Sequence, residues 1–171
     1  MLKLRMSELK YIKHYPSHTQ AQVQELIQHD KLAAYLLKKY PKAHDIKTDK
    51  ALFSYIMAYK NEHMKKSDPL SKALYNGKVQ TLNALGTHRF VSRVQGGKLK
   101  AKNEIRVAPI FKNMPEEFLR MIVIHELAHF KEKEHNKAFY KLCEYMEPNY
   151  HQLEFDLRLY LTQMDMGGKL Y

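Results

Sequence analysis

The feature that most constrains this chain is the apolar segment PEEFLRMIVIHELAHF at residues 115–130. Pro115 and the two glutamates after it are typical of a first helical turn, where acidic side chains favour the positive end of the helix dipole. From Phe118 to Phe130, apolar residues occupy most sides of the helix. We therefore expect a central buried helix of about five turns, which other elements must cover.

This segment also carries His125, Glu126 and His129 in the pattern His-Glu-x-x-His. Histidines at i and i+4 lie on one helix face about 6 Å apart, so both rings can reach one cation. Glu126 points about 100° around the helix, where it can accept a proton from an activated water instead of binding the metal. Burying these groups is costly unless they are paired or bound. The pattern predicts a zinc site with Glu126 as the catalytic residue.

A third histidine, His135, follows six positions after His129. In a continuous helix it would lie about 240° further around and about 9 Å further along, so we expect the helix to end near residues 131–134. Many zinc enzymes with this spacing have glycine where this chain has Glu132, so either a non-glycine residue takes the turn conformation or the turn is wider. Asn136 would cap the next helix. We favour His135 as the third ligand over three later carboxylates, those of Glu144, Glu147 and Glu154.

The N-terminal third of the chain predicts helices. Thr48 or Asp49 begins the clearest of them, with apolar residues at i, i+3, i+4 and i+7. Between Pro69 and Pro109 the pattern changes: Asn76-Gly77 is a hairpin signal, and two alternating segments read as strands, RFVSRV (89–94) and EIRVA (104–108).

This part of the chain predicts a small antiparallel sheet of three or four strands. Two further helices follow Asn136, so the fold class is α+β. We divide the chain into an N-terminal helical region, residues 1–68, and a catalytic core, residues 69–171, within one compact domain.

Composition limits the partners and the compartment. The formal net charge is +11, which favours anionic partners and weak contact with polyanions such as nucleic acid. The single cysteine, Cys143, excludes an intrachain disulfide and an all-cysteine zinc cluster, and it suits a reducing compartment. No apolar run has the length of a signal peptide core or a membrane span. We therefore expect a cytoplasmic protein with no membrane contact.

The residues around the histidines resemble a known family. HELAHFKEKEHNKAFY (125–140), with PEEFLRMIVI before it, closely resembles the core motif of the bacterial YgjP-like metallopeptidase domain. Residues 92–111 and 146–163 are also similar to that family. The resemblance implies a zincin-like core, in which a short sheet precedes the active-site helix. It also implies three histidine ligands and one catalytic glutamate, the residues that the spacing selects.

Two further side chains are candidates for substrate or oxyanion contacts. Many family members carry Arg-Trp-Gly-Ser-Cys-Ser on the strand before the active helix; this chain has RFVSRV, with Arg93 at the cysteine position. Arg93 would supply positive charge for an oxyanion or a phosphate, unless it is an ordinary surface residue. Tyr140 would stabilise a developing oxyanion, unless it only packs or lies at the surface.

These features predict a zinc-dependent hydrolase in which Glu126 activates a zinc-bound water. The main hypothesis is a metallopeptidase acting on peptides. The alternative is a zinc-dependent phosphohydrolase acting on nucleotides, as a nucleoside triphosphate pyrophosphatase, or on RNA; the net charge and Arg93 favour it. A third hypothesis is a non-enzymatic nucleic-acid-binding module with a structural zinc. It requires a closed fourth ligand, and the sequence offers no obvious one.

Overall fold

The computed structural model describes residues 9–76, 86–95 and 98–171, and side chains for residues 9–76 and 103–171. Its elements, in chain order, are α1 (Ser17–Gln28), α2 (Leu32–Lys39), α3 (Asp49–His63), β1 (Leu70–Tyr75), β2 (Gly86–Gln95), β3 (Lys98–Val107), the 3-10 helix η3 (Pro109–Asn113), α4 (Glu116–Ala128), α5 (Lys137–Met146) and α6 (Tyr150–Gly167). Along the sequence, helices precede and follow a small sheet, which confirms the α+β class. Across these described ranges, no helix combines the length and apolarity needed to cross a membrane.

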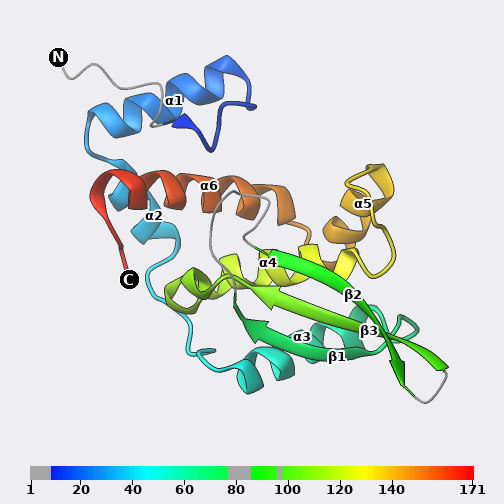
Figure 1. Ribbon diagram of the computed structural model, residues 1–171. Helices are drawn as coiled ribbons and strands as arrows, with labels where there is room; N and C mark the ends of the chain where they lie inside the picture. The colour runs from blue at the N-terminus through cyan, green and yellow to red at the C-terminus, as the bar shows by residue number, and fades with distance from the viewer. Residues whose placement is uncertain (1–8, 77–85, 96–97) are drawn as a thin grey trace.

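Helix α4 is the central element of the fold. It contacts α3, α5, α6 and the strands β2 and β3, and Figure 1 shows it between α6 and the sheet. Nine of its 13 residues are buried, which confirms the prediction of a central buried helix. It ends at Ala128 with His129 as its C-cap, so it is shorter than the five turns predicted.

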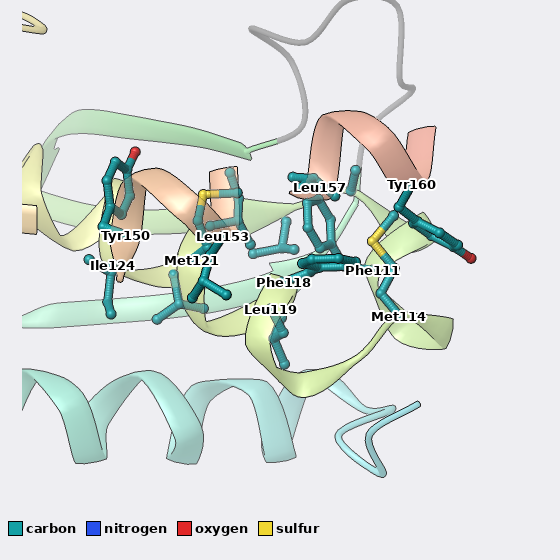
Figure 2. Close-up of a cluster of buried hydrophobic side chains, with 14 of the residues drawn as sticks. Phe111, Met114, Phe118, Leu119, Met121, Ile124, Tyr150, Leu153, Leu157 and Tyr160 are labelled. Atoms are coloured by element: carbon teal, nitrogen blue, oxygen red, sulfur yellow. The ribbon is translucent and has the colours of Figure 1, made fainter. Parts of the chain in front are cut away.

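The core around α4 is built from side chains of η3, α4 and α6 (Figure 2). Phe118 of α4 is fully buried, and its ring contacts Tyr40 and Tyr160, with centroid distances of 4.8 and 5.8 Å. Burial of a side chain of this size contributes about 1.5–3 kcal/mol. Several such contacts hold α4 on more than one side, which gives the residues at its C-terminal end a rigid support.

The three strands form one mixed sheet, in the order β1-β3-β2. Strands β2 and β3 pair antiparallel from Gly86↔Val107 to Gln95↔Lys98, but β1 and β3 pair parallel. The prediction of an all-antiparallel sheet is therefore wrong. The short connection between β2 and β3 forces those two strands to run antiparallel. Because β3 lies between β1 and β2, those two strands are not neighbours and cannot form a hairpin. The predicted hairpin turn at Asn76-Gly77 lies partly outside the described residues.

The N-terminal helices are joined to the rest of the chain by a buried carboxylate. Asp156 of α6 is fully buried and accepts hydrogen bonds from Lys39 and Tyr40, both at 2.5 Å. Helix α3 begins as predicted, because the Thr48 side chain accepts a hydrogen bond from the backbone N–H of Ala51 at 3.1 Å. The link through Asp156 crosses the boundary between residues 1–68 and 69–171; that division remains a prediction.

Candidate metal centre

The site begins at the C-terminal end of α4, where the chain turns without a glycine. The backbone N–H of Glu132 donates to the carbonyl of Ala128 at 3.0 Å, and that of Phe130 to Leu127 at 3.0 Å. Among the described residues, Asp30 is the non-glycine residue with positive φ, so Glu132 does not take the left-handed conformation. The sequence left open a left-handed non-glycine residue at this position or a wider turn, and the structure has the wider turn.

The next helix fixes the end of this turn. Asn136 is the N-cap of α5, and its side-chain oxygen accepts from the backbone N–H of Phe139 at 2.9 Å, which confirms the predicted cap. The Asn136 amide also donates to the Glu132 carboxylate at 3.4 Å. His135 therefore lies between the hydrogen-bonded turn after α4 and the Asn136 cap, and the chain at this residue returns towards α4.

Three imidazoles converge at this point. The Nε2 atoms of His125, His129 and His135 form a triangle with sides of 3.3 Å (His125–His129), 3.1 Å (His125–His135) and 3.0 Å (His129–His135). In a tetrahedral site with Zn–N bonds of about 2.0–2.1 Å, neighbouring nitrogens lie about 3.3–3.4 Å apart, close to these distances. Three lone pairs facing one another are unfavourable without a cation between them. The triangle therefore fits one divalent metal.

The other ring nitrogens determine the tautomers of two of these histidines. His129 Nδ1 lies 3.0 Å from the backbone carbonyl of Glu132, an acceptor, so it carries the proton and leaves Nε2 free. His125 Nδ1 lies 2.7 Å from the Tyr150 hydroxyl. Burial, with the neighbouring rings of His129 and His135, lowers the pKa of His125 to about 3. Burial also lowers the pKa of His129. Both rings are therefore neutral at neutral pH, the form that binds metals.

Glu126 lies beside this triad with its carboxyl group buried. The residue is 2% exposed, and its Oε2 has no hydrogen-bond partner among the described residues. Burial raises the pKa of Glu126 to about 8. A nearby cation favours the ionised form and opposes this effect of burial. A buried carboxyl group directly after the first of three convergent histidines, with one oxygen unpartnered among the described residues, suits a metal site with a general base.

The rival carboxylates are engaged elsewhere. Glu144 pairs with a histidine of α6 at 3.0 Å, and Glu147 pairs with Arg120 at 2.7 Å. Glu154 accepts a hydrogen bond from Tyr150 at 3.2 Å, and Tyr150 in turn contacts His125, so Tyr150 lies between Glu154 and the histidines. Within the part of the chain that has described side chains, the metal-capable group consists of the three histidines alone.

The side chain of Arg93 lies outside the described part of the chain, and only its backbone is placed, paired with Lys100 across β2 and β3. Tyr140 is near: its ring centroid is 6.4 Å from that of His135 and 5.5 Å from that of His151. Burial raises the pKa of Tyr140, so its hydroxyl stays protonated and can donate. Both assignments remain predictions.

Two residues of the site went unnoticed in the sequence. Phe139 contacts all three imidazoles, with centroid distances of 4.6–4.9 Å, and gives the triad an apolar wall. Its helical spacing marked it only as a core residue. Tyr150 contacts His125 from 25 residues away, and no local pattern reports such a contact.

An open pocket of about 270 Å³ lies where α3 ends and meets the turn after α4. Lys65, Lys66 and Lys131 line it, together with Glu62, His63 and Met64. Lys131 belongs to the same turn that carries the metal-capable histidines. The pocket therefore gives one side of this turn a net positive charge.

A group of three histidines that could hold a divalent metal, together with a buried glutamate on the same helix, is the kind of site that metal-dependent hydrolases use. A model of the YgjP-like metallopeptidase domain matches residues 91–160. A curated relative, UTP pyrophosphatase of Escherichia coli (strain K12), is 58% identical over 163 residues, which covers 95% of this chain and 98% of the relative. No solved structure matches. The chain belongs to the YgjP-like family, which confirms the predicted resemblance and the prediction of a hydrolase.

Proposed function

We propose that this chain is a zinc-dependent nucleoside triphosphate pyrophosphatase that hydrolyses UTP to UMP and pyrophosphate. The triangle of Nε2 atoms with sides of 3.0–3.3 Å carries the proposal of metal-assisted hydrolysis. It is supported by the buried Glu126, directly after His125, whose Oε2 has no hydrogen-bond partner among the described residues. The choice of substrate rests on the relative, since identity of 58% over almost the whole of both chains favours shared chemistry. The proposal includes a zincin-like arrangement, with β3 preceding the motif helix α4.

The proposed roles follow from the side chains. His125, His129 and His135 would hold the cation, which would supply Lewis acidity and neutralise phosphate charge. Glu126 accepts the proton of the attacking water at its carboxylate and delivers it to the leaving oxygen. Water attacks the α-phosphorus, the bond to the bridging oxygen breaks, and pyrophosphate leaves.

The charge distribution supports a polyanionic substrate. The net charge of +11 accelerates encounter with an anion. Three lysines line the pocket, and one of them, Lys131, belongs to the turn between His129 and His135. Cations at this turn would favour a polyphosphate over a neutral peptide.

A direct test compares the zinc-loaded wild type with Glu126→Gln, using Glu117→Gln on the same helix as the matched control. Products of UTP are identified by phosphorus NMR. We expect UMP and pyrophosphate from the wild type and the control, and a kcat lower by about 100-fold or more in Glu126→Gln, with zinc still bound. Release of UDP and phosphate, or no turnover by zinc-loaded wild type, would contradict the substrate assignment.

Peptide hydrolysis is the second candidate, because the matching family model describes a metallopeptidase domain. The same zinc-loaded proteins are therefore incubated with a peptide library. Cleavage that Glu126→Gln abolishes, without turnover of UTP, would favour the metallopeptidase.

A further inference from the structure

The hydroxyl group of Tyr150 lies behind the first histidine of the motif. Tyr150 is the first residue of α6 and is fully buried. Its oxygen is 2.7 Å from His125 Nδ1 and 3.2 Å from the Glu154 carboxylate oxygen Oε2. The three groups are linked by hydrogen bonds that run from the histidine triad, through the buried Tyr150 hydroxyl, to the partly exposed Glu154.

The direction of these hydrogen bonds follows from the inventory of donors and acceptors. An ionised carboxylate only accepts, so Tyr150 donates its single proton to Glu154. The phenolic oxygen then has only lone pairs for His125, so Nδ1 of His125 carries the hydrogen. A neutral imidazole with its proton on Nδ1 has its free lone pair on Nε2, the atom that faces His129 and His135.

We propose that Tyr150 and Glu154 are positioning residues that hold His125 in its metal-binding tautomer and orientation. The inference rests on the metal centre of the proposed function. It assigns to Glu154 a role one step behind the ligand, in place of the ligand role that the sequence allowed. His129 needs no such side chains, because a backbone carbonyl fixes its tautomer.

The Glu154 carboxylate, at the far end of these hydrogen bonds, is itself restrained by Arg158. Arg158 Nη2 lies 3.7 Å from Glu154 Oε1, and Arg158 Nη1 donates to the backbone carbonyl of Tyr11 at 2.9 Å. The guanidinium lies 5.9 Å from the centroid of the Tyr15 ring. An arginine anchored on the N-terminal segment thus restrains the carboxylate that determines the direction of the hydrogen bonds.

The first test measures zinc affinity of the full-length protein by competition with a chromogenic chelator. Loss of an outer partner of a ligating histidine typically weakens metal binding by about 10–100-fold, and we expect that loss in Tyr150→Phe. Tyr160→Phe is the matched control, because it removes another buried tyrosine hydroxyl from α6 about 15 Å along the helix; the two rings lie at opposite ends of the cluster in Figure 2. Equal zinc affinity in Tyr150→Phe and wild type, or equal losses in both variants, would overturn the proposal.

The second test uses Glu154→Gln, because Glu154 is partly exposed and the substitution keeps the side-chain shape. An amide can donate to Tyr150, which would let the tyrosine donate to His125 and reverse these hydrogen bonds. Nitrogen-15 NMR of the metal-free protein reports which ring nitrogen of His125 carries the proton. We expect Nδ1–H in the wild type and a gain of the Nε2–H form in the variant. Nε2–H in the wild type would reject the proposed positioning role of Tyr150 and Glu154.

The two proposals fail separately. A wild type that binds zinc but does not hydrolyse UTP would reject the proposed substrate, and zinc affinity would still decide the positioning role of Tyr150 and Glu154. The tautomer of His125 in the metal-free protein tests that positioning role without any measurement of turnover.

Discussion

Replacing Glu126 with glutamine should stabilise the metal-free protein, and the gain should grow with pH. Burial raises the pKa of Glu126 to about 8 from 4.5, so the folded state retains a proton that the unfolded state releases. The free energy of unfolding of the wild type therefore falls as pH rises from about 4.5 to about 8. Glutamine does not titrate, so the difference between the two proteins isolates this carboxyl group.

The expected magnitude follows from the same values. Each pH unit between the two pKa values costs the folded wild type about 1.4 kcal/mol, which amounts to about 3 kcal/mol at pH 7 and approaches 5 kcal/mol above pH 8. A constant cost of burying the glutamine amide does not change with pH and does not affect this slope. Histidine titration occurs in both proteins and cancels.

The measurement is urea unfolding of chelator-treated wild type and Glu126→Gln between about pH 5 and pH 8, with Glu117→Gln on the same helix as the matched substitution for comparison. Saturating zinc should shrink the difference at pH 7, since a nearby cation stabilises the carboxylate. A difference between wild type and Glu126→Gln that stays constant within about 0.5 kcal/mol across this range would refute the reasoning, because the carboxylate would then be solvated.

Three further predictions test the framework around the site. Asp156→Asn should lower the free energy of unfolding by about 2–3 kcal/mol, which is less than for a fully buried ion pair because Lys39 reaches water. Asp165→Asn, in an exposed ion pair, should lower it by less than about 1 kcal/mol. Urea unfolding measures both changes. Asn136→Ala should cost about 1 kcal/mol through loss of its cap and should also weaken zinc binding, as measured by chelator competition. Cys143, whose pKa burial raises to about 12, should resist a thiol reagent at pH 8 until urea unfolds the chain; rapid labelling of the folded protein would contradict its burial.

The parts of the site that could be predicted from the sequence are those set by local geometry. His125, Glu126 and His129 occupy less than two turns of one helix, so their relative positions follow from helix geometry alone. Asn136 could be predicted as a cap because the signal lies within three residues of the N–H that it binds. The return of His135 towards α4 then followed from the need to end one helix and begin another within seven residues.

The parts that could not be predicted depend on contacts between distant segments. Strand pairing in the sheet is one case: β1 pairs with β3 and not with β2, the next strand in the sequence, so the assumption that sequential strands pair failed for β1. Tyr150 is another, since only the packing of α6 against α4 brings its hydroxyl to His125. The separation of Glu154 from the histidines depends on the same packing. The sequence offered that carboxylate as a ligand, but the position of Tyr150 places it one hydrogen bond further away.

The metallopeptidase motif and a pyrophosphatase relative are compatible on physical grounds. In the proposed mechanism, three imidazoles and one carboxylate determine how a water is activated, and that step would serve a phosphoanhydride as well as an amide. Under the proposed function, selection of the substrate would depend on the exposed side of the site, where His135 is exposed and Lys131 lies in the same turn. Charge reversal there, by Lys131→Glu, should therefore raise the KM for UTP and leave zinc affinity unchanged. An unchanged KM would separate the lysine pocket from the substrate and return the question of specificity to β2, which carries Arg93.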